Sequence, residues 1–214
     1  MDQSTVETTR RGLHAVAELV LAGPQYRRSG TVKLLVSPGG FQTSTELRLR
    51  VEGVELVTPT QRLTVSGLSC AQLADAAGVD VGEPEGLYHD GSGAGPGDVV
   101  HLDPQAASWI ESCWAAGDAA LRQLAPDQQP YLWPEHLDVG VLADGFGYGV
   151  SPGDKSFPEP YAYVNPPSSQ AAGAFWNAPF GAARLMRDLD GGRAEAVLAF
   201  FVEGRERAEA DPIA

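Results

Sequence analysis

Apolar residues recur every three or four positions in three long stretches of the chain, which is the spacing of one face of an α-helix. The first stretch is predicted to begin at a capping box formed by Ser4 and Glu7 and to end at Gly23-Pro24. The second begins at Asp103-Pro104, an N-cap residue followed by a first-turn proline. The third stretch covers residues 193–207. The pattern therefore predicts three main helices.

Short runs in which apolar and polar residues alternate predict β-strands between these helices. Four runs in the first half of the chain predict one β-meander, and they cover residues 32–36, 47–51, 54–57 and 62–65. The Pro38-Gly39-Gly40 turn separates the first two runs. Three runs in the second half predict another meander, and they cover His136–Leu142, Phe146–Val150 and Pro160–Val164. Asp144-Gly145 is a hairpin signal between the first two of these.

The order of the elements is helix, strands, helix, strands, helix, without βαβ alternation. It predicts an α+β fold in which antiparallel β-meanders pack against three main helices. A short additional helix is expected from Ser69 to Ala77, with Gly78 as its C-cap. Residues 82–98 are rich in Gly and Pro and carry no periodicity, so they form an internal loop that is either ordered or a mobile linker. We expect one compact domain over residues 1–214.

Charge and composition narrow the class of partner. The 214 residues carry a formal net charge of −13 and only 15 Lys plus Arg, which argues against nucleic acid or an anionic membrane surface as a partner. Lysine occurs only at Lys33 and Lys155, while Ala, Gly, Pro and Arg are abundant. This bias is typical of a high-GC bacterial genome, with adaptation to high salt as the alternative.

The two cysteines and the absence of long apolar runs indicate a compartment. Cys70 and Cys113 lie in no CxxC or CxxH pair, which excludes a structural zinc site held by thiolates. No segment has the apolar length of a signal peptide or of a membrane span. The sequence therefore predicts a soluble cytoplasmic protein. It indicates no cofactor, and the oligomeric state stays open.

The densest collection of chemically capable residues lies between Trp133 and Tyr163. Residues two apart on a strand share a face, so His136 and Asp138 are predicted to point the same way. A histidine beside a carboxylate can act as a general base or hold a metal ion, and Asp138 or Glu135 would orient it. The alternative is a solvated strand face without function.

The loop after the second strand of the C-terminal meander adds two acidic residues to this collection. If the three strands form one sheet, Asp154 and Glu159 lie near one of its edges and can reach His136. His136, Asp138 and Glu159 are thus the candidate catalytic groups. The candidate ligand contacts are Trp133, Glu135, Asp154, Tyr161, Trp176 and Asn177. The alternative is that the acids only shape turns and that the tyrosines pack across strands.

These residues favour a protein that binds a small molecule in a polar cleft beside the C-terminal meander. A non-catalytic structural or protein-interaction domain is the alternative. A third hypothesis, metal-assisted hydrolysis, requires His101 or His89 to come within about 4 Å of His136. No segment matches a motif with a known reaction, so the sequence leaves open whether the protein is an enzyme. Buried tyrosines together with a solvent-facing His136 would favour the structural hypothesis.

The segments WPEHLDVGV, GYGVSPGD and EPYAYVNPP are the most specific part of a wider pattern that runs from about Leu13 to Pro166. In order and character, this pattern resembles a family of uncharacterised bacterial proteins with the motifs PEHxD, GxSPGD and PEPYxYV. That family has no established activity. The resemblance therefore implies one compact domain and assigns no catalytic residues.

Overall fold

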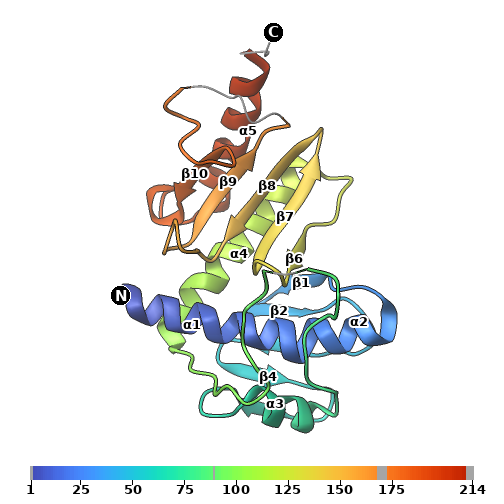
Figure 1. The fold of residues 1–214 in the computed structure, drawn as a ribbon. Helices are drawn as coiled ribbons and strands as arrows, with labels where there is room; N and C mark the ends of the chain where they lie inside the picture. Colours follow the sequence, from blue (N-terminus) through green and yellow to red (C-terminus); the bar gives the residue numbers. More distant parts are fainter. Residues whose placement is uncertain (1, 89, 168–172, 211–214) are drawn as a thin grey trace. The chain divides into compact units, whose positions relative to one another are not determined.

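The computed structural model of the chain describes residues 2–88, 90–167 and 173–210 (Figure 1). These residues belong to two compact units. Unit 1 comprises Met1–Glu111 and Tyr131–Leu137, and unit 2 comprises Ser112–Pro130 and Asp138–Ala214. Both units contain helices and antiparallel strands, which confirms the predicted α+β class. The longest helices are α1, α4 and α5, in the three regions where the main helices are expected.

Unit 1 begins with an unbroken helical run of three segments. It consists of α1 (Gln3–Val16), the π-helix η1 (Ala17–Ala22) and α2 (Gly23–Ser29). The predicted end at Gly23-Pro24 is wrong, because the helical run continues through Pro24 and ends only at Ser29. The predicted capping box is also wrong, since the helix follows Asp2 and has no side-chain cap.

The strands of unit 1 pair in the order β6-β1-β2-β3-β4-β5, and each neighbouring pair is antiparallel. Their bounds are β1 Leu34–Ser37, β2 Gly40–Thr43, β3 Arg50–Glu52, β4 Glu55–Val57, β5 Arg62–Thr64 and β6 Tyr131–Trp133. The strand predicted over residues 47–51 starts only at Arg50, because Arg48 has a positive φ of 55° that breaks the extended backbone. Strands β2 and β6 were not predicted.

The short helix of unit 1 confirms its sequence signals. Helix α3 (Cys70–Ala77) has Ser69 as its N-cap, and Ser69 and Gln72 form a reciprocal capping box. Gly78 ends the helix in the left-handed conformation. Local capping chemistry fixes this helix at both ends.

The strands of unit 2 pair in the order β10-β9-β8-β7, again antiparallel throughout. Their bounds are β7 Asp138–Ala143, β8 Phe146–Ser151, β9 Tyr161–Asn165 and β10 Ala182–Leu185. The predicted hairpin between β7 and β8 is confirmed. Asp144 and Gly145 have positive φ angles of 51° and 83°, and Ala143 pairs directly with Phe146.

Two helices cover one face of this unit 2 sheet (Figure 1). Helix α4 (Pro104–Leu124), whose residues from Ser112 onward belong to unit 2, places Gly117 against Val150 and Val139. Helix α5 (Ala194–Ala210) places Gly204 against Val164. The 3-10 segment η2 (Met186–Asp188) connects β10 toward α5. Because side chains alternate along a strand, the opposite face carries Gly140 and Gly149.

No helix in the described chain combines the length and the apolar character that crossing a membrane requires.

Candidate functional site

The π-helix of unit 1 holds a buried carboxylate. π-Helical segments are rare and frequently lie at functional sites. Glu18 stands at the second position of η1, and only 1% of its surface is exposed. A charged group in this environment loses its hydration and requires hydrogen-bond donors around it. The partners of Glu18 are therefore the starting point for a site.

The Gly/Pro-rich segment 82–98 supplies those partners, and its described part is an ordered loop against η1. The N–H of Gly82 donates to the carbonyl oxygen of Leu19 at 3.0 Å. The N–H of Ser92 donates to Glu18 Oε2 at 2.8 Å, and the Ser92 hydroxyl donates to the same oxygen. A Cβ on Gly91 would lie 2.0 Å from Glu18 Oε1, so this approach requires glycine.

Two polar atoms of this cluster remain without a well-formed hydrogen bond to any described residue. They are Glu18 Oε1 and the hydroxyl of Tyr88. Burial raises the pKa of the Tyr88 phenol, and the nearby Glu18 carboxylate raises it further. Tyr88 therefore keeps its proton at neutral pH and can donate it in a hydrogen bond. Tyr88 lies within hydrogen-bonding reach of the Glu18 carboxylate, whose Oε1 is a strong acceptor without a bond of good geometry to a described residue.

His14 lies one helical turn before Glu18 and connects α1 to the turn of residues 134–137. Its Nε2 lies 2.7 Å from the carbonyl oxygen of Pro134. A carbonyl oxygen only accepts, so this nitrogen carries the hydrogen. Burial lowers the pKa of His14, although the Glu18 carboxylate acts in the opposite direction. His14 is thus a neutral donor that ties α1 to the turn of residues 134–137.

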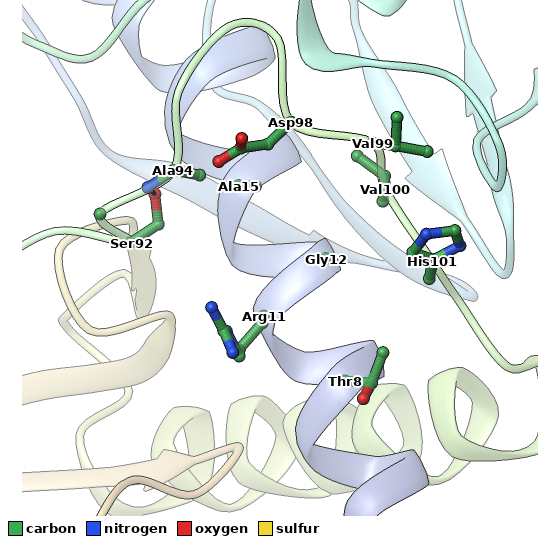
Figure 2. Close-up of a pocket in the computed structure, with 11 residues that line it drawn as sticks. Thr8, Arg11, Gly12, Ala15, Ser92, Ala94, Asp98, Val99, Val100 and His101 are labelled. Carbon is green, nitrogen blue, oxygen red and sulfur yellow. Dashed lines mark hydrogen bonds between the residues drawn. The ribbon is translucent and has the colours of Figure 1, made fainter.

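A cavity of about 410 Å³ lies beside this cluster, between α1 and residues 92–101 (Figure 2). Its volume is within the range of about 300–1,000 Å³ that is typical of small-molecule sites. The lining residues are Thr8, Arg11, Gly12, Ala15, Ser92, Gly93, Ala94, Asp98, Val99, Val100 and His101. Ser92 belongs to both features, because it lines the cavity and also binds Glu18. The wall combines small and apolar residues with the polar side chains of Thr8, Arg11, Ser92, Asp98 and His101.

The residues proposed from the sequence lie elsewhere. His136 is exposed and lies in the turn of residues 134–137, where Leu137 has a positive φ of 57°. Strand β7 begins only at Asp138, which is 9% exposed. The prediction that His136 and Asp138 share one strand face is therefore wrong. The turn separates them, and they belong to different units.

Trp133 and Glu135 belong to unit 1 with His136. Trp133 is 38% exposed, and the ammonium group of Lys33 lies 5.4 Å from its ring centroid and 4.7 Å from that of Tyr131. This is a cation–π contact of the usual length. Glu135 is half-buried in the turn that follows β6. Trp133 thus contacts Lys33 within unit 1 and stays partly exposed.

In unit 2 the structure brings together Asp154 and Tyr161. The Tyr161 hydroxyl donates to Asp154 Oδ2 at 2.6 Å, and the N–H groups of Ser156 and Phe157 donate to Asp154 Oδ1. Burial is the main cause that raises the pKa of Tyr161, and its bond to Asp154 adds to it. Asp154 therefore closes the turn before β9.

The other three residues proposed in unit 2 also make internal contacts. Glu159 accepts two hydrogen bonds from Arg187, at 2.8 and 2.9 Å. The Asn177 amide bonds both the N–H and the carbonyl oxygen of Ala183, at 2.9 and 3.0 Å. Trp176 packs edge-on against Phe175, with ring centroids 5.0 Å apart. These contacts hold the segments around β10.

The tyrosines of unit 2 pack within the fold. Tyr148 is 1% exposed and contacts Phe201 of α5. Tyr163 reaches across Gly149 and Gly140, and its hydroxyl donates to Asp138. Burial, followed by the Asp138 charge, raises the pKa of Tyr163. Together with the exposed His136, this is the arrangement expected from the structural alternative.

Metal and thiol chemistry can be examined over the described ranges of the chain. Within residues 2–88, 90–167 and 173–210, no group of three or more His, Cys, Asp or Glu side chains could hold a metal ion. His101 lines the unit 1 cavity, and His89 lies outside the described residues. Burial raises the pKa of the Cys70 thiol to about 11 and that of Cys113 to about 12.

A second buried carboxylate of unit 1 lies on α4. Glu111 is 8% exposed, and burial raises its pKa to about 7. Its Oε1 has no hydrogen bond to a described residue, and a Cβ on Gly40 would lie 3.6 Å from that oxygen. The charge of Glu52 acts in the same direction as burial, while the backbone of Gly53 opposes it. Glu111 therefore changes its charge near neutral pH.

Glu111→Gln is expected to flatten the pH dependence of stability between pH 4.5 and pH 7. The folded pKa of about 7 exceeds the ordinary value of 4.5 for a glutamic acid, so the stabilising contribution is present below pH 4.5 and is lost as pH rises through 7. At pH 8 we expect the variant to be more stable than wild type by about 1–2 kcal/mol, a value reduced for solvent screening. Urea unfolding at pH 5 and pH 8 measures the difference. Equal unfolding curves of variant and wild type at pH 8 would contradict this expectation. The control is Glu7→Gln, on the exposed face of α1, which should unfold as wild type does at both pH values.

The described geometry thus centres on Glu18, Tyr88 and Ser92 in unit 1, which sequence reasoning missed. The one signal for it was a charged residue inside the apolar run Ala15–Ala22. Comparison with protein-family models, with curated proteins and with solved structures finds no match for this chain. The resemblance to an uncharacterised bacterial family therefore stays a prediction.

Proposed function

We propose that unit 1 binds a small polar molecule in the cavity between α1 and residues 92–101. The observation that carries this proposal is the buried Glu18 behind the cavity wall. Its Oε2 is held by the lining residue Ser92, and its Oε1 has no hydrogen bond of good geometry to a described residue. A small-molecule site combines a mostly apolar wall with a few placed polar groups. The polar cleft predicted beside the C-terminal meander stays a prediction, and the unit 1 cavity is preferred to it.

The preference rests on which polar groups remain available. In unit 2, Asp154, Glu159 and Asn177 already bond to neighbouring side chains or backbone. In unit 1, Glu18 Oε1 and the Tyr88 hydroxyl lie near each other, but neither has a hydrogen bond of good geometry to a described residue. A buried acceptor left unsatisfied costs about 1–3 kcal/mol, so a ligand that donates to it gains that amount in affinity. The ligand is therefore expected to carry at least one N–H or O–H donor.

Glu18→Gln is expected to weaken binding at least tenfold, because an amide is a poorer acceptor than a carboxylate for a buried donor. The ligand is first identified by native mass spectrometry of the protein purified without denaturant, and by thermal shifts with a panel of polar metabolites. Titration calorimetry then compares wild type with the variant. Glu7→Gln, on the exposed face of the same helix, should bind as wild type does. The proposal fails if no compound co-purifies and none in the panel shifts the melting temperature.

For unit 2, the hydrogen bonds that its polar side chains already form favour a non-catalytic, structural function. The specific observation is that Tyr148 and Tyr161 are buried and that Tyr163 and Tyr161 donate to Asp138 and Asp154. Buried hydroxyl–carboxylate pairs of this kind hold strands and turns in register. Substitutions in unit 2 should then act on stability and leave ligand binding by unit 1 unchanged.

A further inference from the structure

The cavity of unit 1 carries two opposite charges that are not joined to each other. Arg11 of α1 and Asp98 of the facing segment both line it (Figure 2). Among the residues that the structure describes, neither of them forms an ion pair within 4.0 Å. Asp98 accepts one hydrogen bond from the N–H of Gly95, at 2.9 Å, through Oδ2. Its other carboxylate oxygen and the Arg11 guanidinium are available to a ligand.

We infer that the ligand of this cavity is a small zwitterion, a free amino acid or a short peptide, with its carboxylate on Arg11 and its ammonium group on Asp98. The inference rests on the function proposed for unit 1 and specifies its ligand class. A guanidinium binds a carboxylate through two parallel hydrogen bonds, and a carboxylate accepts from an ammonium in the same charge-assisted way. Opposite walls of opposite charge thus match the two ends of such a molecule.

The rest of the lining fits the body of the same molecule. Ala15, Val99 and Val100 offer an apolar wall to an aliphatic side chain, while Thr8 and His101 add polar contacts at the rim. Glu18 lies one turn beyond Ala15 on the same helix, and Ser92 joins it to the wall. Each group that the cavity presents has a counterpart in a zwitterion with a short side chain.

Ligands with a single charge fit less well. The chain has a net charge of −13, which disfavours the approach of a simple anion to Arg11. A simple cation can pair with Asp98, but it leaves the Arg11 guanidinium without a partner. A molecule with no net charge and two separated charged ends avoids both penalties.

The experiment compares matched ligands on the full chain. Alanine, valine and glycyl-alanine are the zwitterions, and propionate and propylamine carry only one of the two charges. Thermal shift and titration calorimetry should show binding of at least one zwitterion, at least tenfold tighter than either single-charge compound. Arg11→Gln and Asp98→Asn should each weaken that binding at least tenfold at unchanged melting temperature of the free protein. Arg28→Gln, an exposed arginine of α2, should bind as wild type does.

Two results would overturn the inference in different ways. If the natively purified protein or the metabolite panel yields a ligand that is uncharged or singly charged, and zwitterions do not bind, the ligand class is wrong while the proposed binding function stands. If neither the zwitterions nor any panel compound binds and nothing co-purifies, both the inference and the proposed function fail. Zwitterion binding that Arg11→Gln and Asp98→Asn leave unchanged would likewise overturn the placement of the two charged ends.

Discussion

Gly23→Ala is expected to destabilise unit 1 by about 3 kcal/mol and to detach the loop of residues 82–98 from η1. A Cβ at this position would lie 1.7 Å from the carbonyl oxygen of Gly82, which is backbone and cannot rotate away. Gly23 has helical dihedral angles, so the change introduces no backbone strain of its own. The whole effect therefore measures how closely the loop must approach the helix.

Thermal unfolding gives the first measurement, and a loss of this size lowers Tm by roughly 6–12 °C in a protein of this length. Limited proteolysis gives the second, with faster cleavage expected between residues 82 and 98. Gly97→Ala is the matched control on the same loop, because nothing lies within 4 Å of its Cβ position. That variant should stay within about 0.5 kcal/mol of wild type. Equal stability of the two variants would refute the close approach of loop and helix.

Gly149→Ala is expected to destabilise unit 2 by about 3 kcal/mol, since overpacking at this site cannot be relieved by one rotamer change. A Cβ here would lie 2.4 Å from the Tyr163 hydroxyl, 2.5 Å from the ring carbon that bears it and 2.5 Å from the Val139 carbonyl oxygen. The ring must move away, which breaks its hydrogen bond to the buried Asp138. Urea unfolding followed by circular dichroism measures the loss.

A double-mutant cycle separates the two contacts of this variant. In a Tyr163→Ala background the ring is absent, so Gly149→Ala should cost clearly less than in wild type, leaving only the clash with Val139. Additive effects would contradict the packing of Tyr163 over Gly149. Ligand binding by unit 1 should not change in either variant, and its loss would count against the structural function proposed for unit 2.

Local chemistry made much of the fold predictable from the sequence. Helix caps such as Ser69 with Gln72, and the Asp144-Gly145 turn, act through neighbouring residues alone, and the structure confirms them. Strands β2, β6 and β10 were missed, because the residues in and next to them show no alternation of apolar and polar positions. Gly23-Pro24 was misread as a helix end because the helical run continues through Pro24, and the carbonyl oxygen of Leu19 accepts from the distant N–H of Gly82.

The candidate site was less predictable, and the reason is the π-helix. Periodicity arguments assume 3.6 residues per turn, whereas every residue of Ala17–Ala22 is buried. The side that would face solvent is covered by a loop that begins 60 residues later, at Gly82, and donates to Leu19. No local pattern reports such a contact. Around His136 the sequence predicted a shared strand face that the structure does not have. Leu137 has a positive φ, so the strand begins only at Asp138, and His136 and Asp138 do not lie on one face.

The placement of the two cysteines gives each unit its own chemical probe. Cys70 belongs to unit 1 and Cys113 to unit 2, and both are enclosed in the native fold. Because the thiolate is the nucleophile, alkylating reagents at neutral pH meet two protonated and inaccessible sulfurs. Labelling of either sulfur then reports that its own unit has opened. Peptide mapping after a timed pulse of reagent would distinguish the opening rates of the two halves without any engineered tag.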